Sequence, residues 1–326
     1  MCIFLSVFIY MWFLLPFLIH IIIWFFRPAM TMYGHNPFDS DPENPRHEEV
    51  DYAFKYDTPL SGSRYEILKM IIATISGLSI MRLIMMSLCG CIGCFFIKSG
   101  FISTGCKIVR MSLWWLGYYD INIKGGELSK EAPILVSNHC NAVVESVILY
   151  GDAEGPSFIT RIENMSIPFM SEIVKKSKAI VVDRNSGDSR KQTLLDIEKH
   201  VNSRSSKQLM IFPEGTCNNG KCLFRFNKGA FVCGLPVQPV LFNYPYKHFN
   251  CAYTGNKYGG HELPSLLFRT ACQVFNSVEY KYLPVYYPSD EEKKDPVLYA
   301  KNVQELMASH LHVPVTDATS SGYKKL

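Results

Sequence analysis

Charged residues are scarce in this chain of 326 residues: Asp, Glu, Lys and Arg together make up only 19%. That share is below the usual quarter for globular proteins, while hydrophobic residues reach 48%. The composition excludes a disordered or mucin-like chain, because such chains combine low hydrophobicity with high charge. The formal net charge of +4 is too small to argue for nucleic-acid binding. We therefore expect a globular protein and ask where its apolar residues are concentrated.

The first apolar segment, Cys2–Phe26, contains no Asp, Glu, Lys or Arg, and His20 is its only side chain that titrates near neutral pH. It is long enough for a hydrocarbon core of about 30 Å. It lacks the basic start and the small-residue cleavage site of a signal peptide. We predict an uncleaved membrane anchor at residues 1–27, the alternative being a cleaved leader, and a turn-rich polar linker at residues 28–65.

A second apolar run, Met70–Ile97, contains one charged residue, Arg82, and is interrupted by Gly77, Gly90 and Gly93. It either spans a membrane once with tilt, enters and returns as a hairpin, or forms a buried pair of core helices. Basic residues lie between the two apolar segments and again after the second, and none precedes the first. The positive-inside rule then places both basic regions in the cytosol. This favours membrane-embedded or re-entrant helices within residues 66–120.

Cysteine gives no support for a disulfide framework or a metal site. Eleven cysteines is an odd number, and most lie in apolar or strand-like stretches, which is typical of a reducing compartment. Cys89, Cys91 and Cys94 are close together, but no second Cys/His pair follows at zinc-finger spacing. We therefore predict no metal site.

The remainder of the chain, residues 121–326, alternates short apolar runs with amphipathic stretches. Such alternation predicts an α/β domain with a mostly parallel sheet flanked by helices, here preceded by the N-terminal membrane-associated helices. The predicted strands are Pro133–Ser137, Ser157–Thr160, Ala179–Asp183, Gln208–Phe212, Pro236–Phe242 and Val278–Tyr286. The predicted helices are Ala142–Tyr150, Pro168–Val174, Asp188–Val201 and Asp295–Leu311.

Reactive side chains directly follow several of these strands. His139 ends one of them, and Glu145, six positions later, is a carboxylate that can fix the tautomer of a basic histidine. Arg161 with Glu163, and Arg184, end two others, where arginine can bind phosphate with two parallel hydrogen bonds. Each feature taken alone also fits a surface histidine or a solvated salt bridge.

The turn Phe212–Thr216 follows a further strand. Gly215 allows close backbone approach, and the Thr216 hydroxyl with neighbouring amides can bind an anionic oxygen. Read alone, the segment also fits an ordinary strand-ending turn. The carboxyl ends of parallel strands meet at one edge of a sheet, so we expect the side chains at these ends to form one site. They are His139, Arg161, Arg184 and Glu214.

The same segments resemble the glycerolipid acyltransferases, and most closely the lysophosphatidylcholine acyltransferase branch. The resemblance covers roughly residues 60–320 and depends on strings that are long and specific. These are Phe212–Cys217, Phe226–Phe231, Val237–Val240, Tyr244–Pro245, Leu283–Tyr286, Asp290–Lys293, Asp295–Pro296 and Val315–Asp317.

The resemblance implies transfer of a fatty acyl group from acyl-CoA to the free hydroxyl of a lysophospholipid, with His139 as the general base. It implies acyl-CoA, a lysophospholipid and the lipid bilayer as partners, no nucleic acid, and no cofactor besides the co-substrate. It also implies the endoplasmic reticulum membrane, or alternatively the Golgi, with the catalytic domain facing the cytosol. The substrate-binding residues it implies are Arg161, Glu163, Arg184, Glu214, Gly215 and Thr216.

Two departures from the family pattern matter. The family has histidine, four residues, then aspartate, whereas here five residues separate His139 from Glu145. One extra helical position turns a side chain by about 100°. The longer glutamate could compensate and give a catalytic pair, or the chain could be a non-catalytic lipid-binding relative. A third alternative is the same reaction with glycerol 3-phosphate or lysophosphatidate as acceptor. The second departure is that no calcium-binding EF-hand loop follows the domain, so calcium control is not predicted.

Overall fold

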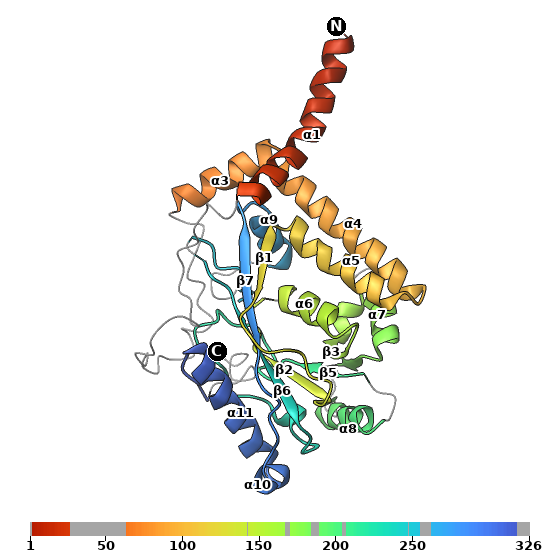
Figure 1. Ribbon diagram of the computed structural model, residues 1–326, viewed down its shortest axis with the longest axis vertical. Coiled ribbons are helices and arrows are strands. Elements are labelled where there is room, and N and C mark those ends of the chain that lie inside the picture. Colours follow the sequence, from red (N-terminus) through yellow and green to blue (C-terminus); the bar gives the residue numbers. More distant parts are fainter. Residues whose placement is uncertain are drawn as a thin grey trace.

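The computed structural model describes residues 2–26, 63–141, 143–166, 170–183, 189–203, 207–246, 248–254 and 262–317. Within them, a seven-stranded sheet with the order β1-β7-β6-β2-β5-β3-β4 forms the centre of the protein (Figure 1). The strands are β1 (Tyr118–Ile123), β2 (Ile134–Ser137), β3 (Ser157–Arg161), β4 (Ile180–Val182), β5 (Leu209–Ile211), β6 (Val237–Asn243) and β7 (Asn276–Tyr282). Every neighbouring pair is parallel except β6 and β7, which confirms the predicted mostly parallel sheet.

Strand β1 has no counterpart among the predicted strands. Its sequence, YYDINI, does not alternate apolar and polar residues cleanly, because β1 lies at the edge of the sheet and is only partly buried. It pairs in parallel with β7, placing Ile121 beside Val278. Pairing with β7 therefore stabilises β1 as a strand, although its local sequence pattern does not predict one.

Helices cover both faces of the sheet. Tyr299 and Val303 pack with Val136 in one buried cluster, whereas Ile148 packs with Val240 in a second cluster on the opposite face. The α/β layering expected from the sequence is therefore present. The helices of this domain are α5 (Ile102–Trp115), α6 (Val144–Asp152), η2 (Ile162–Ser166), α7 (Met170–Ser177), α8 (Ser189–Val201), η3 (Lys228–Ala230), α9 (Leu263–Ala271), α10 (Asp290–Lys294) and α11 (Pro296–Leu311).

The last helix, α11, begins where its capping residues predict. Asp295 accepts hydrogen bonds from Val297 N (2.9 Å) and Leu298 N (3.2 Å), and a proline occupies the first turn. Helices α9 and α10 were not predicted. The short α10 is stabilised by a capping box between Ser289 and Glu292, a pairing whose sequence signal was overlooked.

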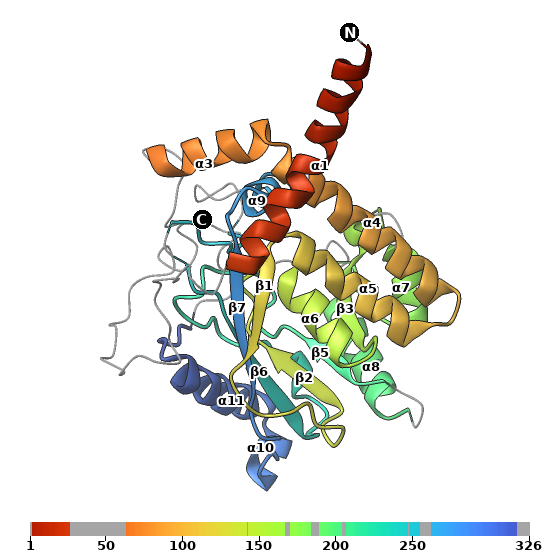
Figure 2. The same cartoon turned by 45° about the horizontal axis from the view of Figure 1, so that its top comes forward.

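Three further helices precede the domain: α1 (Cys2–Phe26), α3 (Arg64–Ile75) and α4 (Leu78–Lys98). The first half of α1 projects away from the rest of the protein in both views (Figures 1 and 2). Among the described helices, α4 is long and apolar enough to cross a membrane, and Leu14–Phe26 is a shorter apolar helix. Large apolar side chains are exposed on all three helices, including Leu18, Ile21, Ile71, Ile72, Ile84 and Phe95.

Helices α4 and α5 form a hairpin (Figure 2). Its two arms approach closely at two glycines. A Cβ atom added at Gly93 would lie 2.9 Å from Gly105 O, and one added at Gly105 would lie 2.7 Å from Gly93 O. The expectation that Gly90 and Gly93 interrupt the second apolar run is wrong, since α4 continues through both and the helix breaks only at Ser76–Gly77. The run Met70–Ile97 itself forms the end of α3 and most of α4, and the hairpin partner α5 lies outside it. Which of the sequence alternatives applies, and how these helices relate to a membrane, stay predictions.

The single charge of this apolar run, Arg82, is fully buried. Its guanidinium donates to the carbonyls of Ala271 (3.0 Å), Gln273 (2.5 Å) and Val274 (3.1 Å), and to Tyr119 Oη (2.8 Å). These carbonyls belong to the last residue of α9 and to residues just after it, where a helix end leaves acceptors unsatisfied. Arg82 therefore joins α4 to the segment between α9 and β7.

Candidate active site

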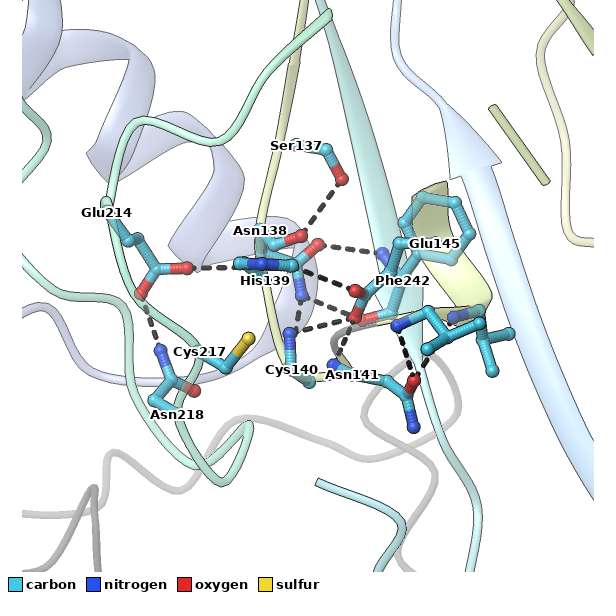
Figure 3. A network of polar contacts seen from close by, with 12 residues as sticks. Ser137, Asn138, His139, Cys140, Asn141, Glu145, Glu214, Cys217, Asn218 and Phe242 are labelled. Atoms are coloured by element: carbon cyan, nitrogen blue, oxygen red, sulfur yellow. Dashed lines mark hydrogen bonds and ion pairs between the residues drawn. The ribbon is translucent and has the colours of Figure 1, made fainter. Parts of the chain in front are cut away.

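The backbone of His139, directly after β2, is held from two sides. Asn138 Nδ2 donates to Phe242 O (2.9 Å) and Asn138 Oδ1 accepts from Phe242 N (2.8 Å), which binds the end of β2 to β6. His139 N donates to Glu214 Oε1 (3.1 Å), and His139 O accepts from Asn218 N (3.0 Å), so the turn after β5 holds the other side (Figure 3). The main chain presenting the imidazole is thus fixed by its two neighbouring strands.

The side chain of His139 is paired with Glu145. His139 Nδ1 lies 3.0 Å from Glu145 Oε2, while Glu145 Oε1 accepts from Cys140 N (2.8 Å) and Asn141 N (2.7 Å). The extra residue in the spacing lies in the turn before α6, which begins only at Val144. The 100° rotation that a continuous helix would impose therefore does not apply. The Glu145 side chain is fully buried, whereas 17% of the His139 side chain is exposed, so the imidazole can be reached from outside.

Asn141 shapes this turn, and its role was missed in the sequence. Asn141 Oδ1 accepts from Val143 N (2.9 Å) and Val144 N (3.1 Å), and Asn141 Nδ2 donates to Cys251 O (2.7 Å). Asparagine is a preferred residue at the start of a helix, and that preference was the available signal. Asn141 also holds the loop after β6 against the histidine turn.

Two further side chains contact the imidazole. The Phe212 ring stacks on His139 with centroids 4.1 Å apart and planes 19° apart, and the Cys217 side chain lies close enough to affect its pKa. Burial by itself lowers the pKa of His139, but Cys217 and Glu145 raise it by more, so its pKa lies well above 6.5. Burial raises the pKa of the Cys217 thiol.

Glu214 is fully buried and faces three donors. They are His139 N (3.1 Å), Asn218 Nδ2 (2.5 Å) and Phe224 N (2.9 Å). Burial raises the pKa of Glu214 to about 8, against the opposing effect of the bonds from Phe224 N and His139 N. Both carboxylate oxygens are therefore engaged by the protein, and the carboxylate holds together the histidine turn and the segment after β5.

The two residues after Glu214 are half-buried beside it. Gly215 has φ +71°, a left-handed conformation that glycine adopts without strain, and it turns the chain back toward His139. The Thr216 hydroxyl makes one long contact, 3.5 Å, to Cys217 O. The structure thus brings together five of the predicted site residues: His139, Glu145, Glu214, Gly215 and Thr216.

The predicted charged residues lie further along the same edge of the sheet. Arg161 ends β3 and Glu163 lies in η2, and both are exposed. Because β5 separates β3 from β2, Arg161 is about 10 Å from His139 across the sheet, two strand spacings. Arg184 lies outside the described residues. The phosphate-binding roles of these residues stay predictions.

Comparison with known proteins finds similar sequences. Residues 120–243 match the family model Acyltransferase. Lysophosphatidylcholine acyltransferase 1 of Danio rerio is 37% identical over 218 residues, which are 65% of this chain and 40% of that protein. Lysophosphatidylcholine acyltransferase 2 of Homo sapiens is 37% identical over 218 residues, 66% of this chain and 39% of that protein. The chain thus spans about 40% of the length of these relatives.

A solved structure also matches the chain. The 1-acyl-sn-glycerophosphate acyltransferase of Thermotoga maritima has a TM-score of 0.43 and 17% sequence identity, covering 70% of this chain and 96% of that chain. The resemblance that the motifs indicated is confirmed by the family match and by the relatives at 37% identity.

Proposed function

We propose that this chain, which carries an acyltransferase domain at residues 120–243, moves a fatty acyl group from acyl-CoA to the free hydroxyl of a lysophospholipid. The observation that carries the proposal is that His139 Nδ1 lies 3.0 Å from the buried Glu145 carboxylate while the His139 imidazole is itself partly exposed. The names of the relatives support lysophosphatidylcholine as the leading acceptor.

His139 acts as the general base in this proposal. With Nδ1 donating its proton to Glu145, the other ring nitrogen is unprotonated and can accept the proton of the acceptor hydroxyl. The hydroxyl oxygen then attacks the thioester carbonyl, and CoA leaves as a thiol that takes the proton back from the imidazolium. A well-placed base is worth roughly 10²–10⁴ in rate. Glu145 stabilises the imidazolium in between.

Glu214 serves as a positioning residue rather than as a direct substrate contact. Its carboxylate is fully buried and accepts from the backbone of His139, so it acts on the reaction by holding the base in place. Gly215 and Thr216, half-buried beside it, remain the proposed contacts for the glycerol phosphate. The proposed charged contacts to phosphate are Arg161, Glu163 and Arg184.

The proposed location is a membrane of the endoplasmic reticulum, or alternatively of the Golgi, with the catalytic domain in the cytosol. Residues 1–27 act as anchor, 28–65 as linker and 66–120 as membrane-embedded helices, ahead of the catalytic domain at 121–326. The exposed apolar side chains on α1, α3 and α4 support this division, because soluble proteins rarely leave large apolar patches uncovered. The reaction uses acyl-CoA as co-substrate and requires no further cofactor.

The test uses membranes containing the full chain, labelled acyl-CoA and a panel of acceptors: lysophosphatidylcholine, lysophosphatidate and glycerol 3-phosphate. We expect transfer to lysophosphatidylcholine, and a loss of about 10²-fold or more in His139→Ala. His310→Ala, on α11 at the opposite face of the sheet, is the matched control and should keep its activity. Equal turnover in His139→Ala would contradict the mechanism. Lipid binding without turnover in the wild type would identify a non-catalytic relative.

A further inference from the structure

A buried polar side chain, Gln304, lies on the face of α11 that packs against the sheet. Its neighbours Val303 and Met307 belong to the hydrophobic core there, and only 4% of Gln304 is exposed. Gln304 Nε2 donates to Leu223 O (3.2 Å) and to Phe224 O (2.9 Å), both in the segment between β5 and β6. Buried polar groups cost free energy unless they are hydrogen-bonded. An apolar side chain of similar length would fill this position without that cost, so the contribution specific to glutamine is the pair of bonds to the backbone.

One peptide group connects Gln304 to the candidate active site. It joins Leu223 to Phe224, and its carbonyl, Leu223 O, accepts from Gln304 Nε2 and from Thr316 N (3.0 Å). Its N–H, Phe224 N, donates to Glu214 Oε2 (2.9 Å) on the other side. A peptide group is planar and rigid, so holding its oxygen also fixes the direction of its N–H. Hydrogen bonds in such a chain also polarise one another.

Glu214 carries the connection to the base. Its Oε1 accepts from His139 N (3.1 Å), while its Oε2 accepts from Phe224 N. Burial raises the pKa of Glu214 to about 8, and the bond from Phe224 N opposes that rise. A firmly held Phe224 N–H therefore favours the ionised carboxylate, the form in which both oxygens accept. The position of the His139 main chain thus depends on a side chain of α11, by way of one peptide group and one carboxylate.

The segment after α11 holds the same peptide group. Leu223 pairs with Val315 in a parallel β-bridge, in which Leu223 N donates to Pro314 O (3.0 Å) and Thr316 N donates to Leu223 O (3.0 Å). The Leu223 backbone is therefore held both by α11 and by the residues that follow it. All of these partners lie beyond residue 243, where the match to the acyltransferase family model ends.

We propose that Gln304 is a positioning residue for the general base, acting on His139 through the Leu223–Phe224 peptide group and Glu214. The proposal rests on the proposed function for its effect on turnover, whereas its effect on the His139 backbone is independent of that function. It assigns a role in the reaction to α11, which lies outside the matched residues 120–243.

The first measurement is amide hydrogen exchange on the purified full chain in detergent micelles, followed by mass spectrometry at the residues around His139. Gln304→Met keeps the length and flexibility of the side chain and removes both hydrogen bonds to the backbone. We expect exchange of the His139 amide to become about tenfold faster, because losing hydrogen bonds of ordinary strength shifts a local opening equilibrium by about that factor.

The second measurement is acyl transfer from labelled acyl-CoA to lysophosphatidylcholine in membranes that contain the full chain. We expect Gln304→Met to lower kcat about tenfold and to leave KM for both substrates unchanged, since a displaced base slows the chemical step without altering substrate contacts. In the Glu214→Gln background, Gln304→Met should change kcat by less than about twofold, because the connection is already broken there.

Tyr299→Phe is the matched control on the same helix. Tyr299 Oη donates to Leu235 O (2.9 Å), a backbone carbonyl just before β6 begins, at the end of that strand away from His139. The variant loses one bond from α11 to the backbone, so Tm should fall while kcat and exchange at His139 stay unchanged. If Gln304→Met does not fold, Thr316→Pro removes the other donor to Leu223 O and should change exchange and kcat in the same direction.

Three results would overturn the proposal: unchanged exchange at His139 in a folded Gln304→Met chain, an equal loss of kcat in Tyr299→Phe, or fully additive losses with Glu214→Gln. A wild type that transfers no acyl group would refute the proposed function alone. The exchange measurement would then still decide whether Gln304 positions His139, since faster exchange supports the connection and unchanged exchange contradicts it.

Discussion

Replacing Glu145 by glutamine tests the catalytic pair directly. Glutamine has the same shape, and its amide oxygen can still accept from Cys140 N and Asn141 N, which lie 2.8 Å and 2.7 Å from Glu145 Oε1. Its amide nitrogen then faces His139 Nδ1 in place of the oxygen at 3.0 Å. Because an amide nitrogen only donates, His139 must turn Nδ1 into an acceptor and carry its proton on the other ring nitrogen.

The expected cost follows from that change of tautomer. The ring nitrogen that should remove the acceptor's proton would already be protonated, and the imidazolium would have no counter-charge. We expect kcat to fall by about 10²–10⁴, equivalent to about 3–5 kcal/mol of transition-state stabilisation. Glu145→Ala is a poorer probe, because it leaves two buried backbone N–H groups without an acceptor and costs about 1–3 kcal/mol of stability for each.

The assay is transfer from labelled acyl-CoA at saturating lysophosphatidylcholine, together with the thermal midpoint Tm of each variant. Glu305→Gln, on the exposed side of α11, is the matched control, since the same substitution there leaves the site untouched. A folded Glu145→Gln protein that keeps more than about a tenth of the wild-type kcat would refute the role given to this carboxylate.

Three further predictions concern the buried Glu214 side chain, the pH dependence of kcat/KM and the α4–α5 hairpin. Glu214→Gln should lower kcat and leave the acceptor KM unchanged. It should also lower the free energy of unfolding in urea by ~2–4 kcal/mol, because the amide nitrogen would face hydrogen-bond donors. A raised KM at constant kcat would instead mark Glu214 as a substrate contact. Because the pKa of His139 is raised, kcat/KM should rise with pH through an apparent pKa above 6.5. Glu145→Gln should move that rise to lower pH. A pH profile that does not move would contradict the pairing of His139 with Glu145. Gly93→Ala should lower Tm measurably, because its Cβ would meet Gly105 O at 2.9 Å; an unchanged Tm would show that the helices separate freely.

Much of the fold could be predicted because its signals are local. The strands ending at Ser137 and Arg161 are short apolar runs bounded by polar turns, and Asp295–Pro296 is a helix start readable from two residues. Strand β1 and the continuous helix through Gly93 could not be predicted in the same way. Each depends on a partner distant in sequence: β7 for the strand, and Gly105 on α5 for the glycine. Sequence periodicity carries no information on such partners.

The candidate site shows the same division. The position of His139 and the turn at Glu214 followed from strand ends meeting at one edge of the sheet, and the structure brings them within hydrogen-bond distance. Whether Glu145 can pair with His139 could not be predicted from the five residues between them. The pairing depends on α6 beginning at Val144 rather than immediately after the histidine. The burial of Glu214 was likewise beyond the sequence, since its three donors come from separate turns.

One reversal in the sheet explains how the apolar helices come to lie at the edge that carries His139. Strand β7 runs antiparallel to β6, and β1 runs parallel to β7. The amino ends of β1 and β7 therefore fall at the edge where β2 and β6 end, the edge of His139. Both strands are entered from segments joined to the apolar helices: α5 leads into β1, and the segment before β7 is held by Arg82 of α4. A fully parallel sheet would have placed those entries at the opposite edge, far from the imidazole.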